Sequence, residues 1–294
     1  MADHESPELV ASFFTLSGAG FGEPPRNGFT ERCEAAAAAG FTGIGLHADD
    51  LPRTIAAGLD LGEIQAVLRI NGLSVVELEF LGGWALPPAE TPASTTDPSP
   101  APYLKTLDRI EAVADSLGGR HVSAGEFRGD AELDAGAASG RLREVSDRLA
   151  AHDLLVAVEP FPWSAISTIA IATDLIRQSG ATNVGLMIDV WHFFNSGAEL
   201  SVLDHLPGAG VAAFQLNDGP LVHEDFLINA RATRKLPGQG DLDVVGLIRA
   251  ARGSGFAGPW CVEVNTPEFR ALPVDEAARQ AADSATEVLR AAMV

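Results

Sequence analysis

The chain contains few cysteines and few basic residues. Two cysteines among 294 residues, Cys33 and Cys261, cannot form a disulfide framework, so the disulfide-stabilised class of small secreted domains is excluded. Lysine and arginine number 20 against 40 aspartates and glutamates, giving a formal net charge of −20. No basic stripe is visible, so we expect neither nucleic acid nor an anionic membrane as a partner.

The sequence also lacks a long apolar run and a targeting signal. No apolar stretch reaches the roughly 20 residues of a membrane-spanning helix. Residues 1–8 contain neither the basic nor the apolar region of a signal peptide. Together with two thiols that we expect to be free and buried, this predicts a cytoplasmic protein whose partner is a small molecule. The oligomeric state, a homo-oligomer included, stays open.

The sequence does contain short apolar runs that alternate with helical segments. Strands are predicted at 9–16, 43–47, 74–81, 121–127, 155–159, 185–189, 211–215 and 260–263. Helices are predicted at 30–39, 61–71, 103–117, 131–152, 165–179, 199–205, 244–254 and 275–293. This alternation implies parallel strands with right-handed crossovers. Eight such units predict an α/β fold of the (β/α)8 or TIM-barrel type, formed by residues 1–294 as a single domain.

Residues 82–102 interrupt this alternation. The segment opens with Gly82-Gly83-Trp84 and continues with many proline, threonine, serine and alanine residues. Because a long loop without secondary structure in a compact domain is usually functional or disordered, we predict a lid with Trp84 near its base. A disordered loop tip is the alternative.

Four of the predicted strands end in a side chain that can bind a metal. These residues are Glu159, Asp189, Gln215 and Glu263. In a parallel barrel the carboxyl ends of the strands meet at one face, so the four side chains should converge there. Their oxygen atoms suit one divalent metal ion, Mg²⁺ or Mn²⁺ first, with Co²⁺ or Zn²⁺ as alternatives. The competing interpretation is that each acid only caps a strand or begins a loop.

Other polar residues follow these strand ends. His192, three residues after Asp189, could bind a substrate oxygen or move a proton. Arg231 and Arg234 could bind an anionic group, since arginine matches carboxylate and phosphate geometry. Asp218 could pair with an arginine or a histidine, or simply cap a loop. Weaker candidates on other strands, which could equally be satisfied polar groups, are His47, Glu79, His121 and Glu126.

These residues resemble the xylose-isomerase-like TIM-barrel superfamily, the sugar phosphate isomerases and epimerases, over nearly the whole chain. Within it, three stretches are similar to bacterial 3-dehydroshikimate dehydratases: Phe-Gln-Leu-Asn-Asp at 214–218, Arg-Ala-Thr-Arg-Lys-Leu-Pro-Gly-Gln-Gly-Asp at 231–241, and Gly-Pro-Trp-Cys-Val-Glu at 258–263. The sequence departs from that pattern at Asn217 and Gly219, where the dehydratases have alanine, and in the length of 82–102. The aromatic and histidine motifs of their first half are not clearly present.

The resemblance implies a metal held by Glu159, Asp189, Gln215 and Glu263, and a reaction that begins with proton abstraction next to a carbonyl. We expect a metal-dependent lyase, a dehydratase acting on a polyhydroxylated cyclic keto acid similar to 3-dehydroshikimate. Catalysis is assigned to His192, Glu159 and Glu263, and substrate contacts to Arg231, Arg234, Asp218 and Trp84. The alternative within the superfamily is a sugar or sugar-phosphate isomerase or epimerase.

Two other classes fit less well. An endonuclease built on the same barrel would need a multi-zinc site and a basic groove, which seven scattered histidines and the acidic charge do not favour. A sugar-binding module without catalysis would not need four intact metal ligands.

Overall fold

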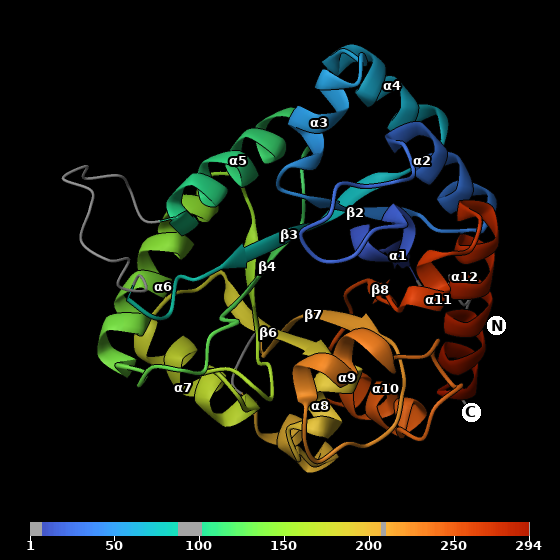
Figure 1. The fold of residues 1–294 in the computed structure, drawn as a ribbon. Coiled ribbons are helices and arrows are strands. Elements are labelled where there is room, and N and C mark those ends of the chain that lie inside the picture. The colour runs from blue at the N-terminus through green and yellow to red at the C-terminus, as the bar shows by residue number, and fades with distance from the viewer. Residues whose placement is uncertain (1–7, 88–101, 207–209, 294) are drawn as a thin grey trace.

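Eight parallel strands form a closed barrel, surrounded by helices, in the computed structural model (Figure 1), which describes residues 8–87, 102–206 and 210–293. Each strand pairs with the next in sequence order, and the eighth pairs with the first. The strands are β1 (Leu9–Ala11), β2 (Gly43–His47), β3 (Ser74–Gly82), β4 (His121–Gly125), β5 (Leu155–Glu159), β6 (Val184–Asp189), β7 (Val211–Leu216) and β8 (Trp260–Val262). The TIM-barrel prediction is confirmed.

Helices connect the strands on the outside of the barrel. They are α1 (Phe13–Ser17), α2 (Phe29–Ala38), α3 (Asp50–Ala56), α4 (Leu61–Ile70), α5 (Pro102–Leu117), α6 (Ala135–Ala150), α7 (Ile169–Ser179), α8 (Val190–Asn195), α9 (Phe226–Ala232), α10 (Val244–Gly253), α11 (Pro267–Arg270) and α12 (Val274–Ala291), with a 3₁₀ helix η1 (Leu200–His205). Within the described ranges, no helix combines the length and the apolar character needed to cross a membrane.

Side-chain caps account for several helix boundaries. Asp60, Asp134, Thr168 and Asp243 each accept a hydrogen bond from a backbone N–H in the first turn, at the starts of α4, α6, α7 and α10. These bonds satisfy donors that a helix start otherwise leaves free. Gly180 ends α7 in the left-handed region, at φ 63°, as expected for a glycine at a helix end.

The predicted strand at 9–16 is wrong beyond Ala11. Ser12 caps α1 by accepting from the backbone N–H of Phe14, and the N–H of Phe13 donates to Glu79 Oε1 across the barrel. The apolar run therefore turns into a short helix at the end of the strand. Four further short helices, α3, α8, α9 and α11, were not predicted, because segments of four to seven residues carry too little periodicity to be recognised.

The main apolar core lies between the barrel and the helices, whereas the inside of the barrel is partly polar. The core contains the outward side chains of the strands, such as Ile44, Leu78 and Leu186. The barrel interior contains two small apolar groups, one around Met187 and one around Cys261. Cys261 is free and buried, as predicted. The predicted lid falls mostly on residues 88–101, which lie outside the described residues.

Candidate functional site

The four predicted metal ligands lie at the carboxyl ends of adjacent strands. Glu159 and Asp189 are the last residues of β5 and β6, Gln215 is the penultimate residue of β7, and Glu263 directly follows β8. The strand register places Asp189 beside Gln215, and the backbone N–H of Glu263 donates to Leu216. All four side chains are at least 94% buried. The barrel thus brings the four residues to one end, where TIM-barrel active sites lie.

Asp189 is held from two sides. It ends β6 and caps α8, with Oδ1 accepting the backbone N–H of His192 at 2.9 Å. Its Oδ2 accepts from the Asn217 side-chain amide at 2.5 Å and lies 3.1 Å from Arg234 Nη1. These contacts fix the direction in which the carboxylate points.

Gln215 has one anchored and one unpartnered end. Its Nε2 donates to Glu77 Oε1 at 3.0 Å. Its Oε1 is buried and has no hydrogen-bond partner among the described residues. Since buried polar atoms are almost always paired, an unpartnered amide oxygen next to carboxylates is suited to bind a cation.

Three ligand atoms already lie close enough for one ion. A carboxylate oxygen of Glu159, one of Asp189 and a ring nitrogen of His192 are within 4.8 Å of one another. Glu159 is steadied by Ser123, whose hydroxyl donates to Oε2 at 3.0 Å. Glu159, Asp189 and His192 therefore fit a divalent cation, and Gln215 and Glu263, which line the same cavity as Glu159 and His192, offer further oxygen atoms to it.

His192 lies beside this group and is uncharged. Burial lowers the pKa of His192 to about 3, Asp189 acts in the opposite direction, and Arg234 lowers it further. Arg234 Nη2 donates to His192 Nε2 at 2.7 Å, because arginine has no acceptor. The imidazole is also packed edge-on against the rings of Phe161 and Trp163. His192 is therefore a neutral imidazole in a fixed orientation.

Two carboxyl groups of the site, those of Glu159 and Glu263, have raised pKa values. Burial, followed by the neighbouring Glu263 and Asp189, raises the pKa of Glu159 well above its ordinary value. Burial raises the pKa of Glu263 to about 7, although Arg234 acts against this shift. Arg234 Nη1 contacts Glu263 Oε2 at 2.5 Å. Crowded carboxyl groups with raised pKa values, against which Arg234 is the arginine paired among the described residues, are suited to exchange their protons for a cation.

A cavity of about 190 Å³ opens directly above these residues. One wall consists of aromatic rings: Phe127 and Phe161 stack at 5.0 Å, Phe161 and Trp163 at 5.1 Å, and Phe80 packs against Phe127. His47 and Glu79, two of the weaker sequence candidates, also line the cavity. A ligand in this space would contact the polar ligand group on one side and flat apolar surface on the other.

Arg231 and Arg234 both line the cavity, but they differ in burial and in ion pairing. Arg234 is buried and paired with Asp189 and Glu263. Arg231, on α9, packs over the ring of Phe21 at 5.2 Å, and none of the described residues forms an ion pair with it. Arg231 therefore presents a positive charge at the mouth of the cavity.

Two predicted substrate contacts do not line the cavity. Trp84 is fully buried in the main core. Asp218 is buried beside the site, where its Oδ1 accepts the backbone N–H of Gly219 and of Leu242. Asp218 thus holds the segment that carries both arginines. Of the remaining weak candidates, His121 lies deeper in the barrel and Glu126 binds the backbone N–H groups of Leu86 and Arg128.

Sequence reasoning missed several residues that complete the site. Glu77, Ser123 and Asn217 each hold one of the predicted ligands through a hydrogen bond. Each is a polar residue within or directly after an apolar strand, which is a weak signal because such residues are common in barrel interiors. The aromatic wall comes from β3 and from the loops after β4 and β5, and the sequence gives no pattern that groups these rings.

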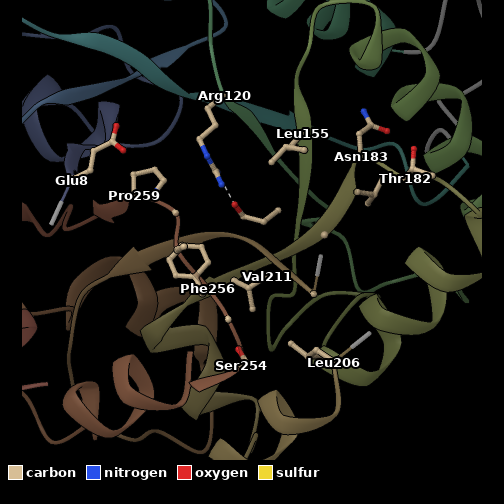
Figure 2. A pocket seen from close by; sticks show the side chains of 17 residues that line it. Glu8, Arg120, Leu155, Thr182, Asn183, Leu206, Val211, Ser254, Phe256 and Pro259 are labelled. Carbon is tan, nitrogen blue, oxygen red and sulfur yellow. Dashed lines mark hydrogen bonds between the residues drawn. The ribbon is translucent and has the colours of Figure 1, made fainter. Parts of the chain in front are cut away.

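A second and larger cavity, of about 450 Å³, lies at the opposite end of the barrel (Figure 2). Its lining comes from the starts of β5, β6 and β7 and from residues 254–259. Arg120 enters it, but its guanidinium donates to the backbone oxygen of Ala212 at 2.7 Å. Glu8 is the single carboxylate in this lining, so the larger cavity lacks the converging acids of the smaller one.

Curated relatives of the chain are dehydratases and isomerases. A 3-dehydroshikimate dehydratase of Pseudomonas putida is 26% identical over 248 residues, covering 83% of this chain and 37% of the relative. An inosose isomerase of Bacillus licheniformis is 30% identical over 152 residues, covering 50% of this chain and 53% of the relative. The chain thus spans only part of the length of these relatives, at most 53%.

A solved structure described as an IOLI protein with a bound zinc atom superimposes with a TM-score of 0.81 at 18% identity, over 97% of this chain and 98% of that one. This likeness concerns the fold. A family model described as xylose isomerase-like TIM barrel matches residues 33–291. Because that match covers most of the chain, including all four strand-end ligands, the protein belongs to the xylose isomerase-like TIM-barrel family.

Proposed function

We propose that the protein is a divalent-metal-dependent lyase, a dehydratase that acts on a polyhydroxylated cyclic keto acid similar to 3-dehydroshikimate. The observation that carries this proposal is the cluster of Glu159, Asp189 and a neutral His192, whose ligand atoms lie within 4.8 Å of one another, at a cavity that Gln215 and Glu263 also line. The relatives named 3-dehydroshikimate dehydratase support the reaction class. Oxygen ligands favour Mg²⁺ or Mn²⁺, while the zinc-containing neighbour keeps Zn²⁺ as an alternative.

The metal would supply Lewis acidity that stabilises an enolate next to the substrate carbonyl. His192 or one of the ligand carboxylates, Glu159 or Glu263, takes the proton from the α-carbon. The electron pair left on carbon then forms the double bond while the β-hydroxyl takes up a proton and leaves as water. The neutral His192 can accept a proton, but its pKa of about 3 makes it a weaker base than Glu159 and Glu263, whose pKa values are raised.

The cavity walls fit a cyclic anion. The stacked rings of Phe127, Phe161 and Trp163 offer a flat apolar surface for the C–H face of a ring. Arg231 offers an exposed guanidinium for a carboxylate. Arg234 contacts the oxygens of Asp189 and Glu263, with which a divalent cation would also interact, so loading the site would release this guanidinium towards the same anionic group.

The alternative is a keto-sugar isomerase or epimerase. It is favoured by the relatives named inosose isomerase and by the presence of two carboxylates, Glu159 and Glu263, on the wall of one cavity. Two such groups could exchange protons with the substrate from different strands.

Product analysis separates the two reactions. Metal-free protein should be supplied in turn with Mn²⁺, Mg²⁺, Co²⁺ and Zn²⁺ and assayed with 3-dehydroshikimate and with a panel of neutral keto-sugars. We expect an aromatic dihydroxybenzoate, formed by loss of water and detected by its ultraviolet absorbance. Turnover of keto-sugars to their epimers, without turnover of the keto acid, would favour the alternative.

The metal assignment is tested by isosteric changes at the ligands. Glu159→Gln, Asp189→Asn and Glu263→Gln should each abolish turnover and bound metal, with the fold retained, because an amide removes a negative ligand without changing volume. Metal content is measured on the purified variants and folding by circular dichroism. A variant that kept both wild-type turnover and wild-type metal content would exclude that residue as a ligand.

A further inference from the structure

A chain of hydrogen bonds runs through the polar interior of the barrel to the amide of Gln215. Arg120 Nη1 lies 3.3 Å from His121 Nδ1, His121 Nε2 lies 3.3 Å from Glu77 Oε1, and that oxygen also accepts from Gln215 Nε2 at 3.0 Å. The chain begins at the cavity of Figure 2, where Arg120 is held by Ala212, and ends at the opposite face of the barrel.

The donors and acceptors of this chain have only one consistent assignment. Arginine can only donate, so His121 Nδ1 accepts and its proton lies on Nε2. His121 Nε2 therefore donates to Glu77, and an ionised Glu77 can only accept. Its second oxygen accepts from the thiol of Cys261 at 3.2 Å. Glu77 is thus an acceptor with three donors around it, one of which is the Gln215 amide.

Glu77 decides which end of the Gln215 amide faces the cavity. The two ends of an amide have nearly the same shape, and only the oxygen can bind a cation. With Nε2 directed at a carboxylate, rotation of the amide by 180° would place Oε1 against the negative charge of Glu77. The observed orientation instead leaves Oε1 on the side of the amide away from Glu77, without a hydrogen-bond partner among the described residues.

We propose that Glu77 is a positioning residue that holds the Gln215 amide oxygen towards the divalent cation, an inference that rests on the metal-dependent function proposed above. Glu77 is 0% exposed, and a buried carboxylate is costly unless several donors stabilise it. His121, Cys261 and Gln215 supply these donors. Hydrogen-bond partners behind metal ligands commonly contribute to metal affinity in this way.

The test compares two substitutions that remove the same charge. Glu77→Met deletes the acceptor, whereas Glu77→Gln keeps an oxygen that can accept from both Gln215 and His121. We expect Glu77→Met to bind Mn²⁺ about 10- to 100-fold more weakly than the wild type, and Glu77→Gln to retain most of the affinity. Mn²⁺ affinity is measured by titration with detection of free Mn²⁺ by electron paramagnetic resonance.

Because both variants lose one negative charge, only their difference reports the orientation of the amide. Equal affinities of the two variants, or wild-type affinity in Glu77→Met, would overturn the proposal. Glu126→Met serves as a matched control, since it removes another buried carboxylate that binds backbone N–H groups and does not contact Gln215. If the wild-type protein bound no Mn²⁺ and no other divalent ion, the proposed function itself would fail instead.

A measurement on the wild-type protein keeps the proposal testable even if Glu77→Met does not fold. In nitrogen-15 spectra, assigned by comparison with Gln215→Glu, one side-chain amide proton of Gln215 should exchange slowly with solvent. Addition of Mg²⁺ should shift the carbonyl carbon of that side chain and leave the slow proton in place. Exchange of both protons as rapidly as in an exposed glutamine would contradict the contact with Glu77.

Discussion

At the scale of single residues, the two arginines of the site differ in whether their guanidinium groups are free to bind a substrate. Arg234 is enclosed by Asp189, Glu263 and His192, whereas Arg231 lies exposed at the mouth with its guanidinium over Phe21. The protein carries a net charge of −20, so an anion approaching the cavity needs a local positive charge. Arg231 is placed to provide it.

Arg231→Ala should raise KM for an anionic substrate by about tenfold, because a charge-assisted hydrogen bond contributes about 1.5 kcal/mol or more. Its effect on kcat should be small, since the residue contacts the entrance and not the metal ligands. KM is measured for the keto acid and for a neutral keto-sugar, with Arg69→Ala on α4 as a control. An equal change for both substrates would show that Arg231 acts by shape and not by charge.

The sequence singled out the strand-end residues as candidate metal ligands for a reason that does not extend to the residues that support them. A carboxylate at the end of an apolar strand, as at Glu159 or Asp189, is conspicuous because burial of an unpaired charge is costly. Glu77 lies in the middle of β3 and was not selected, because a single polar residue inside a strand does not reveal what it contacts. Gln215 and Glu77 are 138 residues apart, and only the closed barrel brings them together.

At the scale of elements, the segment between β7 and α10 carries both arginines and is tied down by Asp218. A two-stranded bridge joins Asp218 to Lys235, and Asp218 Oδ1 accepts two backbone N–H groups, from Gly219 and Leu242. A side chain at Gly240 would meet the Asp218 carboxylate and the Gly219 backbone. The close approach of these loops explains the glycine and fixes the position of Arg231 and Arg234.

Asp218→Ala should loosen this segment by leaving two backbone donors without an acceptor, at a cost of about 1–3 kcal/mol for each buried group. We expect a higher KM and a lower midpoint of thermal unfolding, while metal content stays at the wild-type value. Asp218→Asn keeps one acceptor oxygen and should behave more like the wild type. A loss of metal in Asp218→Ala would mean that the segment also supports the ligands.

There is a physical reason why the short helices in this half of the molecule could not be predicted from the sequence. In α8, Asp189 both ends β6 and caps the helix, so the strand and the helix share one residue. In α9, which has seven residues, Ala230 is the buried residue, so the helix has no complete apolar face. Their positions depend on contacts with neighbouring loops, and local sequence preference alone does not determine them.

At the scale of the whole molecule, the acidic groups of the site link stability to pH and to metal. The pKa of Glu263 is raised to about 7 from an ordinary 4.5, and burial raises the pKa values of Glu159 and Glu79 well above theirs. The folded state therefore holds these protons more tightly than the unfolded state does. Their contribution to stability is complete below about pH 4.5 and is lost as the pH rises through the raised values.

The contribution of His192 to stability depends on pH in the opposite sense. Because its pKa is lowered from 6.5 to about 3, its contribution is present above pH 6.5 and is lost as the pH falls towards 3. Burial also lowers the pKa of His47, so between pH 4.5 and 6.5 the two histidines offset two of the three carboxyl groups and the net slope remains negative. Metal-free protein should thus unfold at a lower temperature at pH 8 than at pH 5.

Divalent metal should reverse this trend, because it binds the deprotonated carboxylates and stabilises the folded state by mass action. The midpoint of thermal unfolding is measured at pH 5 and pH 8, with EDTA and with Mn²⁺. The increase caused by Mn²⁺ should be larger at pH 8, and Glu263→Gln should reduce both effects. A midpoint of the metal-free protein that did not change with pH would contradict the linkage.

The pairing of β1 with β8 has a consequence for how the protein is made. Leu9 is in register with Trp260, and the backbone N–H of Ser12 donates to the backbone oxygen of Val262. The strand that pairs with the second edge of β1 therefore lies about 250 residues later in the sequence. At a synthesis rate of about 5–20 residues per second, the outer edge of β1 waits about 12–50 s on the ribosome before its partner exists. Throughout that time an unpaired strand edge is available to other chains. A nascent chain stalled before Trp260 should therefore associate with chaperones, and one stalled far enough beyond Ala291 for β8 and α12 to have emerged should be released from them.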